Sequence, residues 1–293
     1  MDDLLKCCTL CPRNCRVNRY ETVGACGANS NVRLAHYSLH EWEEPVISGE
    51  SGSGTVFFSH CNLKCIFCQN NDISELGYGK EISISKLQEI YFKLKEMGAN
   101  NINLVTPTHY VPQIIESLKD ITLDLPIVYN TSSYENVETI QLLDGIVDIY
   151  LADLKYFDPK LGEKYSHCKN YFEVATAAIK EMYKQVGDPI IKDDLMKKGL
   201  IVRVLVLPGH VDDAKKIIRY LYETYGDHIY ISIMNQYTPM KKFEFNNLNR
   251  KLSDSEYDEI IDYACDLGIT KAFIQEGETA STSFIPKFNC ENI

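Results

Sequence analysis

The sequence predicts an α/β protein built around a parallel sheet, and two observations support this fold class. Short runs rich in β-branched and aromatic residues alternate with longer amphipathic runs over about 180 residues. Such alternation implies right-handed crossovers between parallel strands, with helices covering the sheet. Six of these units can form either an open barrel or a doubly wound sheet. In both architectures, functional residues gather where the strands end.

The expected strands are short, and each is bounded by turn-forming or polar residues. Thr55 begins the first strand directly after a Gly-Ser-Gly turn, and Pro208 and Gly209 close the fifth. A polar excursion at 187–199 precedes the fifth strand. The expected strands span residues 55–58, 101–106, 126–130, 148–154, 200–207 and 229–234, with 271–274 as a candidate seventh.

The expected helices combine apolar residues at helical spacing with recognisable ends. Ser85 with Gln88 fits a capping box at the start of the first helix, and Ser253 with Glu256 fits one at the start of the last. The helices are expected at residues 85–97, 111–120, 134–144, 171–186, 212–225 and 253–267.

Composition and charge argue against several classes of function. The 293 residues carry a formal net charge of −11, which disfavours nucleic acids as partners because phosphate binding needs a basic face. No run approaches the ~18 apolar residues of a membrane span, and the first residues do not resemble a secretory signal. We therefore expect a cytoplasmic protein. In that compartment thiols stay reduced, so the spacing of the eleven cysteines indicates metal binding rather than disulfides.

Three cysteines, Cys61, Cys65 and Cys68, fall within eight residues directly after the first expected strand. A loop at this position can direct three sulfurs toward one metal centre, either zinc or an iron–sulfur cluster. A structural zinc ion requires a fourth ligand, and none is close in the sequence. A four-iron cluster held by three cysteines leaves one iron open, which is what a catalytic centre needs.

This spacing of three and then two intervening residues, with the aromatic Phe67 before the last cysteine, resembles the signature of the radical S-adenosylmethionine (SAM) superfamily. The resemblance implies a partial (β/α)6 TIM-like barrel, with the cluster loop after the first strand. It also implies a 4Fe-4S cluster whose open iron binds the methionine part of SAM. Reductive cleavage then yields a 5′-deoxyadenosyl radical, which abstracts a hydrogen atom. We therefore expect an oxidoreductase in which Cys61, Cys65 and Cys68 hold the catalytic cluster.

Residues 52–240 resemble more narrowly the pyruvate formate-lyase activating enzymes and their uncharacterised relatives. Matching runs are Asp153-Leu154-Lys155, Asn130-Thr131-Ser132, and the strand from Arg203 that ends in Pro-Gly. In that family these strand ends contact SAM, so the resemblance implies cosubstrate contacts for Asn130, Asp153, Lys155 and Arg203. The residue types suit this role, because lysine and arginine bind carboxylates and aspartate binds ammonium or hydroxyl groups.

The sequence departs from the superfamily after the second strand, where a Gly-Gly-Glu run is common. Thr106-Pro107-Thr108-His109 stands there instead, so Thr108 and His109 become candidate cosubstrate residues. The activases also carry a histidine after the sixth strand, where this chain has Asn235-Gln236-Tyr237. These departures favour a relative of the activases over a pyruvate formate-lyase activator itself.

A second set of cysteines, Cys8, Cys11, Cys15 and Cys26, lies in an irregular N-terminal segment. Four thiols can complete either a zinc site or a full iron–sulfur cluster, and the spacing fits neither common pattern closely. Cys7 is an alternative to Cys8. A metal would explain how so short a segment stays folded. We expect two parts, a cysteine-rich N-terminal segment at 1–50 and a barrel domain at 51–293.

Residues 40–47 connect the two cysteine sets and contain the only tryptophan with three glutamates. Two interpretations are open, contact with a substrate or a solvated linker, and the second is favoured because charge runs usually face water.

The resemblance implies hydrogen abstraction from a substrate, and two versions remain open. The substrate is either a glycine in a partner protein, as for a glycyl-radical-enzyme activase, or a small molecule or another protein side chain. An electron donor such as a flavodoxin or ferredoxin is expected in both. The alternatives are a non-catalytic iron–sulfur electron-transfer protein and a zinc-stabilised nucleic-acid binder, the latter opposed by the charge of −11.

Overall fold

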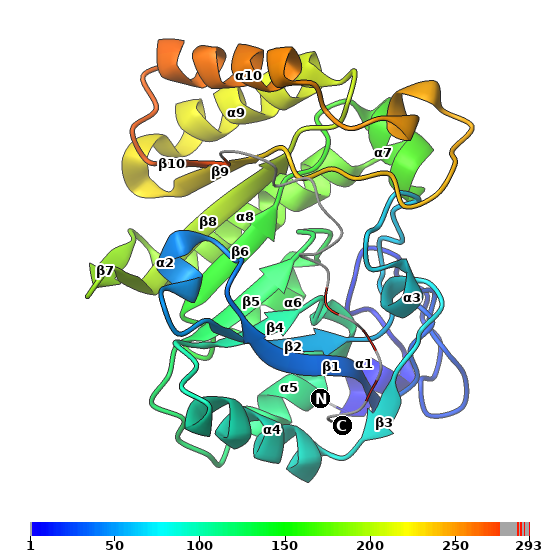
Figure 1. Cartoon of the computed structure of the whole chain (residues 1–293). Coiled ribbons are helices and arrows are strands. Elements are labelled where there is room, and N and C mark those ends of the chain that lie inside the picture. The colour runs from blue at the N-terminus through cyan, green and yellow to red at the C-terminus, as the bar shows by residue number, and fades with distance from the viewer. Residues whose placement is uncertain (1, 276–285, 287, 289, 291–292) are drawn as a thin grey trace.

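The computed structural model describes residues 2–275 together with residues 286, 288, 290 and 293. Its centre is one sheet in the order β10-β9-β8-β6-β5-β4-β2-β1-β3, with β7 paired to β8 only (Figure 1). The strands are β1 Val32–His40, β2 Ser53–Phe58, β3 Lys80–Ile82, β4 Ile102–Val105, β5 Ile127–Thr131, β6 Ile149–Asp153, β7 Ile190–Lys192, β8 Leu195–Leu205, β9 Tyr230–Met234 and β10 Ala272–Ile274.

The strands along the path β10-β9-β8-β6-β5-β4-β2 pair in parallel. Antiparallel pairing joins β1 to β2 and β3, and β7 to β8. Among the described residues, no pairing joins the edge strands β10 and β3, so the sheet curves without closing. The prediction of a partial (β/α)6 TIM-like barrel is confirmed, with β2, β4, β5, β6, β8 and β9 as the six strands. The candidate seventh strand is confirmed as β10.

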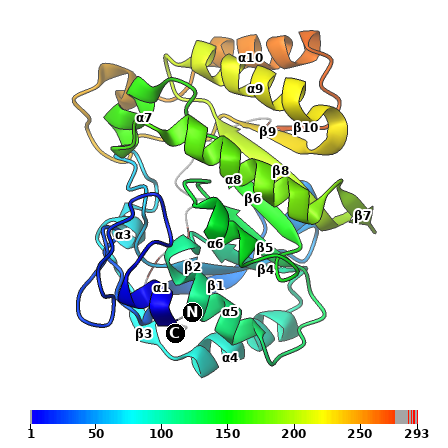
Figure 2. The same ribbon diagram turned by 180° about the vertical axis from the view of Figure 1, so that it is seen from behind.

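Helices cover the outer face of the curved sheet, as Figures 1 and 2 show from two sides. Their burial follows the sequence pattern, since α4 buries Leu87, Ile90, Tyr91 and Leu94. The α-helices are α1 Asp2–Lys6, α2 Pro45–Ser48, α3 Asn71–Ser74, α4 Ile84–Glu96, α5 Val111–Leu118, α6 Val137–Gln141, α7 Pro159–Ser166, α8 Tyr171–Val186, α9 Val211–Tyr225 and α10 Asp254–Asp266. Short 3₁₀ turns are η1 Thr108–Tyr110, η2 Gly226–His228 and η3 Asn246–Asn249.

Several local expectations need correction. The polar excursion at 187–199 contains the hairpin of β7 and β8, so the fifth barrel strand begins earlier than expected. Helix α6 is shorter than its apolar pattern suggested, and α7 had no clear sequence signal. Ser83, rather than Ser85, caps α4 by accepting a hydrogen bond from the N–H of Lys86. The capping box of Ser253 and Glu256 at the start of α10 is confirmed.

Alternation along the strands separates an outer apolar face from a partly polar interior. On β6, Tyr150 and Ala152 pack among the helices, whereas Ile149 and Leu151 belong to a smaller apolar cluster inside the barrel. Asp153 continues the inward-facing series at the carboxyl end of the strand. The interior is therefore apolar near the amino ends of the strands and charged near their carboxyl ends.

Residues 41–48, which include α2, form a plug inside the barrel. His40 at the end of β1 pairs with Ser53 at the start of β2, so the plug enters at the amino ends of the parallel strands. Ile47 is fully buried there in the interior apolar cluster. The expectation of a solvated linker at 40–47 is wrong for Ile47, because an open barrel interior offers it apolar surface to bury, whereas Glu41, Trp42 and Pro45 are exposed as expected.

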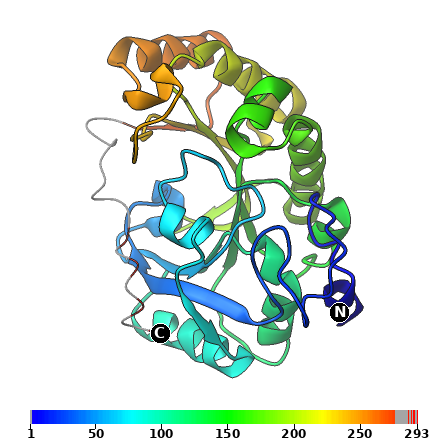
Figure 3. The ribbon, with the colours of Figure 1, turned by 90° about the vertical axis from the view of Figure 1, so that its right-hand side faces the viewer.

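The N-terminal segment, dark blue in Figure 3, lies at one side of the barrel. It consists of α1 and irregular loops around a small apolar cluster of Leu5, Cys8 and Leu10. Because β1 already belongs to the sheet, we propose that the cysteine-rich segment ends near residue 31 and that the barrel domain begins with β1. In the described part of the chain, no helix is both long and apolar enough to cross a membrane.

Candidate active site

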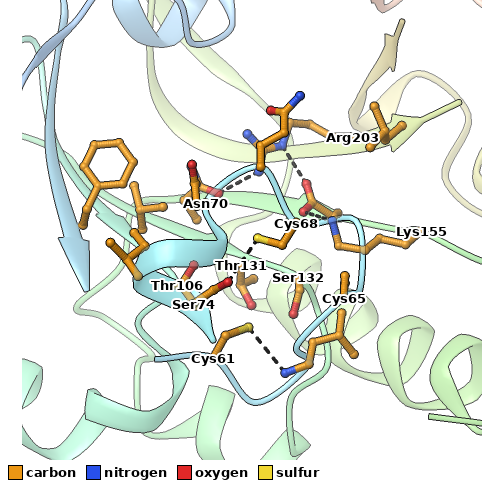
Figure 4. Close-up of a pocket in the computed structure, with 18 of the residues that line it drawn as sticks. Cys61, Cys65, Cys68, Asn70, Ser74, Thr106, Thr131, Ser132, Lys155 and Arg203 are labelled. Atoms are coloured by element: carbon orange, nitrogen blue, oxygen red, sulfur yellow. Dashed lines mark hydrogen bonds and ion pairs between the residues drawn. The ribbon is translucent and has the colours of Figure 1, made fainter. Parts of the chain in front are cut away.

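The loop after β2 carries Cys61, Cys65 and Cys68, and all three line one pocket of about 260 Å³ (Figure 4). The loop turns sharply because His60 and Lys64 adopt left-handed backbone conformations, with φ of 74° and 53°. Burial, reinforced by the neighbouring Cys65 and Cys68, raises the pKa of the Cys61 thiol to about 12. Thiols in such a place become thiolates when a cation replaces the proton.

Each of the three sulfurs accepts a hydrogen bond. Donors aimed at sulfur stabilise the negative charge of thiolates and of an iron–sulfur cluster. The donor and acceptor pairs are Leu63 N–H to Cys61 at 3.4 Å, Ser74 Oγ to Cys68 at 3.3 Å and Ser166 Oγ to Cys65 at 3.0 Å.

The residues of this loop fit a four-iron cluster. In the described part of the chain, no three His, Cys, Asp or Glu side chains converge closely enough to hold a single metal ion. A four-iron cluster binds each thiolate to a different iron and does not require such convergence. When bound, this cluster supplies one electron at its open iron, and Cys61, Cys65 and Cys68 are the residues that would hold it.

Phe67 anchors the cluster loop in an aromatic shell. Its ring meets Tyr156, Tyr165 and Tyr237 edge to face, at centroid distances of 6.5, 6.1 and 6.0 Å. These contacts fix the loop between the two flanking cysteines and cover it with apolar surface. Phe67 also lines the pocket, in agreement with its place in the motif.

Four charged and polar side chains form a network on the pocket floor. Asp153 accepts hydrogen bonds from Lys155 Nζ and from Arg203 Nε, each over 2.7 Å. Arg203 also donates to Asn130 Oδ1 over 2.7 Å. Its Nη1 lies 3.3 Å from Oε2 of Glu43, which comes from the plug. The structure thus brings together Asn130, Asp153, Lys155 and Arg203, as the sequence predicted, and adds Glu43.

Mutual pairing keeps these groups charged. Burial alone would raise the pKa of Asp153, but Arg203 and Lys155 together outweigh it and lower that pKa. Burial likewise opposes the charge of Lys155, yet Asp153 and the nearby Cys65 raise its pKa. The pocket therefore presents fixed cations beside the cysteine sulfurs.

Thr108 and His109 lie outside the pocket lining, in η1. Thr108 Oγ1 donates to Oε1 of the buried Glu135 over 2.6 Å, and Nε2 of His109 donates to the carbonyl of Ser59 over 2.8 Å. Both side chains are buried. This placement contradicts the expectation that they contact the cosubstrate, because 3₁₀ geometry turns them into the protein. Thr106, from the same run, lines the pocket instead.

Sequence reasoning missed two groups near the sulfurs. Ser166 ends α7, a helix without a clear sequence pattern, and nothing in the sequence indicated its contact with Cys65. Glu43 had a signal, the glutamates beside the only tryptophan, but local composition favoured a linker.

The four N-terminal cysteines lie near one another in pairs, although among the described residues no three of them converge closely enough to hold a single metal ion. The thiols of Cys8 and Cys15 lie close enough to influence each other's pKa, and Cys26 lies close enough to Cys11 to help burial raise the Cys11 pKa to about 12. Gly24 sits between two of the sulfurs: a Cβ there would lie 3.3 Å from Sγ of Cys26 and 3.6 Å from Sγ of Cys15. Only a residue without a side chain leaves this space to the thiols.

Cys7 is exposed, whereas its neighbour Cys8 is buried. Cys8 is therefore the member of this pair that faces the other thiols, which supports the expected set of Cys8, Cys11, Cys15 and Cys26.

Comparison with known proteins identifies the family. The family model of the Radical SAM superfamily matches residues 55–221, more than half of the chain. Uncharacterized protein MJ0674 of Methanocaldococcus jannaschii is 33% identical over 275 residues, which cover 89% of this chain and 75% of that protein.

Solved structures with similar folds include a domain of a pyruvate-formate lyase-activating enzyme from Bacteroides vulgatus. It is 14% identical, with a TM-score of 0.39, and the match covers 66% of this chain and 91% of that one. Streptococcus suis SuiB bound to S-adenosylmethionine is 14% identical, with a TM-score of 0.49, and the match covers 74% of this chain and 48% of SuiB. The chain thus spans about half the length of SuiB.

The family match covers the cluster loop and the strands that carry Asn130, Asp153, Lys155 and Arg203. The chain belongs to the Radical SAM superfamily, and it is an enzyme of the radical SAM type.

Proposed function

We propose that this enzyme reductively cleaves SAM at a 4Fe-4S cluster held by Cys61, Cys65 and Cys68 and abstracts a hydrogen atom from a substrate. One observation supports this most directly: the three sulfurs line the same pocket as the network of Asp153, Lys155 and Arg203. A centre for electron delivery and a set of fixed charges for a zwitterionic cosubstrate thus meet in one cavity.

The residues of the network have distinct roles in this proposal. Lys155 lies near Cys65 and Cys68, so its ammonium is the cation best placed for the carboxylate of SAM. Arg203 contributes a second cation to the same pocket. Asp153 is a positioning residue, since both of its oxygens are already engaged by these two cations.

Asn130, Thr131 and Ser132 at the end of β5 line the same wall of the pocket. The Thr131 hydroxyl donates to the buried Glu135, and the Asn130 amide is held by Arg203 and Glu43. The Ser132 hydroxyl is therefore the group best suited to the ribose hydroxyls of SAM. The aromatic shell around Phe67 limits the access of water to the sulfurs, which protects a reactive radical from quenching.

The substrate is either a glycine of a partner protein, which would make this chain a glycyl-radical-enzyme activase, or a small molecule. His40, Trp42, Gln69 and Gln236 also line the pocket. We infer that the substrate approaches past these residues. A flavodoxin or ferredoxin would supply the electron.

The test is 5′-deoxyadenosine formation by the anaerobically reconstituted protein with reductant and SAM. Wild type is expected to form the product and Cys65→Ala to form none. Cys265→Ala, which alters an exposed cysteine on α10, is the matched control and should behave as wild type. Wild type that contains the cluster but forms no product, with or without candidate substrates, would favour the non-catalytic electron-transfer protein.

We also propose that Cys8, Cys11, Cys15 and Cys26 bind a metal centre, zinc or iron–sulfur. The support is their pairwise proximity, with Gly24 packed against Cys15 and Cys26. Metal analysis of protein purified without oxygen tests this, and equal metal content in wild type and a Cys11→Ala variant would contradict it.

A further inference from the structure

We propose that the N-terminal cysteines hold an iron–sulfur cluster that passes electrons to the catalytic centre through Cys61. This deepens the proposed function and rests on it in one respect, namely that the catalytic cluster needs an external electron. The argument comes from the two residues that flank Cys61, because each contacts the N-terminal cysteine set.

The first contact runs through Asn62. Its side chain lies beside the thiol of Cys11, and its Nδ2 donates to the carbonyl of Tyr134 over 2.7 Å. Asn62 is only 2% exposed, so this contact is shielded from water. One through-space contact and one short covalent path therefore separate Cys11 from Cys61.

The second contact runs through His60. Its ring packs directly on Gly27, where a Cβ would lie 2.8 Å from Nδ1 of His60. Gly27 follows Cys26 in the sequence, and His60 precedes Cys61. Two separate elements of the N-terminal cysteine set thus lead to the same catalytic cysteine.

Arg13 fixes the two cysteine sets against each other. It lies between Cys11 and Cys15 in the sequence, and its Nε donates to the carbonyl of Asn62 over 2.8 Å. The rest of the guanidinium donates to the carbonyls of Ser166 at 2.9 Å, His167 at 2.7 Å and Leu63 at 3.3 Å. A planar, permanently charged fork held at four acceptors leaves little freedom for relative motion. A constant separation favours repeated electron transfer.

Thiolate ligands alone suit zinc and iron equally. The position of the N-terminal cysteines favours iron–sulfur over zinc. A structural zinc ion needs no contact with the residues beside a catalytic cysteine. In the proposed order of electron transfer, a low-potential protein donor of the flavodoxin or ferredoxin class loses one electron to the N-terminal cluster. That cluster is reoxidised when the same electron reaches the catalytic cluster. No proton or atom moves in either step.

The test counts iron and records electron paramagnetic resonance (EPR) spectra of anaerobically reconstituted full-length protein. Wild type is expected to hold about eight irons per chain. The four N-terminal thiolates would hold one four-iron cluster, and the three thiolates of the loop after β2 would hold the other. A variant with Cys11→Ala and Cys15→Ala should lose half of this iron, and so should a variant with Cys61→Ala, Cys65→Ala and Cys68→Ala. Cys265→Ala should lose none.

The reduced wild type should give an EPR spectrum broader than the sum of the two variant spectra, because neighbouring paramagnets couple. Flavodoxin hydroquinone should reduce the catalytic cluster more slowly in the Cys11 and Cys15 variant, whereas reduction by dithionite should be unchanged.

Three results would overturn the inference: one zinc and four irons in wild type, two clusters without magnetic coupling, or equal flavodoxin rates in wild type and variant. If the N-terminal variant fails to fold, the triple cysteine variant decides, since it must retain half of the iron and an EPR signal. None of these readouts needs SAM. Two coupled clusters in a protein that forms no 5′-deoxyadenosine would therefore refute the proposed function and leave this inference standing.

Discussion

The hydroxyl of Ser166 lies 3.0 Å from Sγ of Cys65 and donates a hydrogen bond to it. The same hydroxyl is 2.7 Å from the hydroxyl of Tyr156, so the two side chains form a short chain that ends on the sulfur. This contact ties the end of α7 to the cluster loop across about a hundred residues of sequence. It gives the protein a way to adjust the electronic properties of a cluster bound at Cys65.

Replacing Ser166 with alanine should lower the reduction potential of the catalytic cluster. A hydrogen bond to sulfur stabilises the more negative, reduced state, and a bond worth about 1 kcal/mol corresponds to ~40 mV for one electron. The potential is measured by EPR-monitored redox titration. Ser117→Ala removes another buried serine, which bonds to the carbonyl of Ile114 on α5, and should leave the potential unchanged. Equal potentials in all three proteins would contradict the assigned role.

Asp153→Asn should destabilise the protein without its cofactors. The substitution keeps the size of the side chain but removes the charge that pairs with Lys155 and Arg203, in a place where Asp153 is only 17% exposed. We expect the free energy of unfolding to fall by about 3–5 kcal/mol, as when one partner of a buried ion pair is removed. Urea denaturation measures this.

The matched control for this substitution is Glu259→Gln, which breaks an exposed ion pair with Lys215. Exposed pairs contribute about 0–1 kcal/mol, so its effect should be small. Comparable losses in the two variants would show that the network contributes no more than a surface pair.

Glu43→Gln should weaken SAM binding although residue 43 lies in the plug. The carboxylate of Glu43 accepts hydrogen bonds from Asn103 and Asn130, each over 3.3 Å, and pairs with Arg203. Without its charge, Arg203 and Asn130 lose part of their fixed orientation. We expect the Kd for SAM, measured by calorimetry on cluster-loaded protein, to rise about tenfold, the effect of losing one charged hydrogen bond. Glu41→Gln, at an exposed position of the same segment, is the control and should leave the Kd for SAM unchanged. A Kd that is unchanged in Glu43→Gln as well would refute the role of Glu43.

Acidification should destabilise the fold through His109. Burial, together with the nearby Arg19, lowers the pKa of His109 to about 3, whereas an unfolded histidine titrates near 6.5. Between these values the unfolded chain binds more protons, so stability falls as the pH drops below about 6.5. At pH 5 the loss from this group is on the order of 2 kcal/mol.

Urea denaturation of His109→Gln at pH 7 and pH 5 checks this prediction. Glutamine can still donate to the carbonyl of Ser59 but does not titrate, so the loss on acidification should shrink by about 2 kcal/mol. His167→Asn, which replaces an exposed histidine, is the control and should keep the dependence of wild type. An unchanged pH dependence in His109→Gln would contradict the argument.

The fold class followed from local patterns, because strand and helix periods are written in neighbouring residues. The apolar face of α4 and the capping box of Ser253 and Glu256 are examples. The plug was missed for the opposite reason. Ile47 is buried by strands that lie far away in the sequence, and no local pattern signals a partner that the curved sheet creates.

The sequence by itself determined the chemistry of the catalytic loop. The spacing of Cys61, Cys65 and Cys68 and the presence of Phe67 depend only on neighbouring residues, and strand ends of a parallel sheet necessarily share one edge. Only the tertiary structure decided which side chains reach that edge. Packing turned His109 into the core and brought Glu43 and Ser166 to the site, because burial and hydrogen bonding are settled between segments distant in the chain.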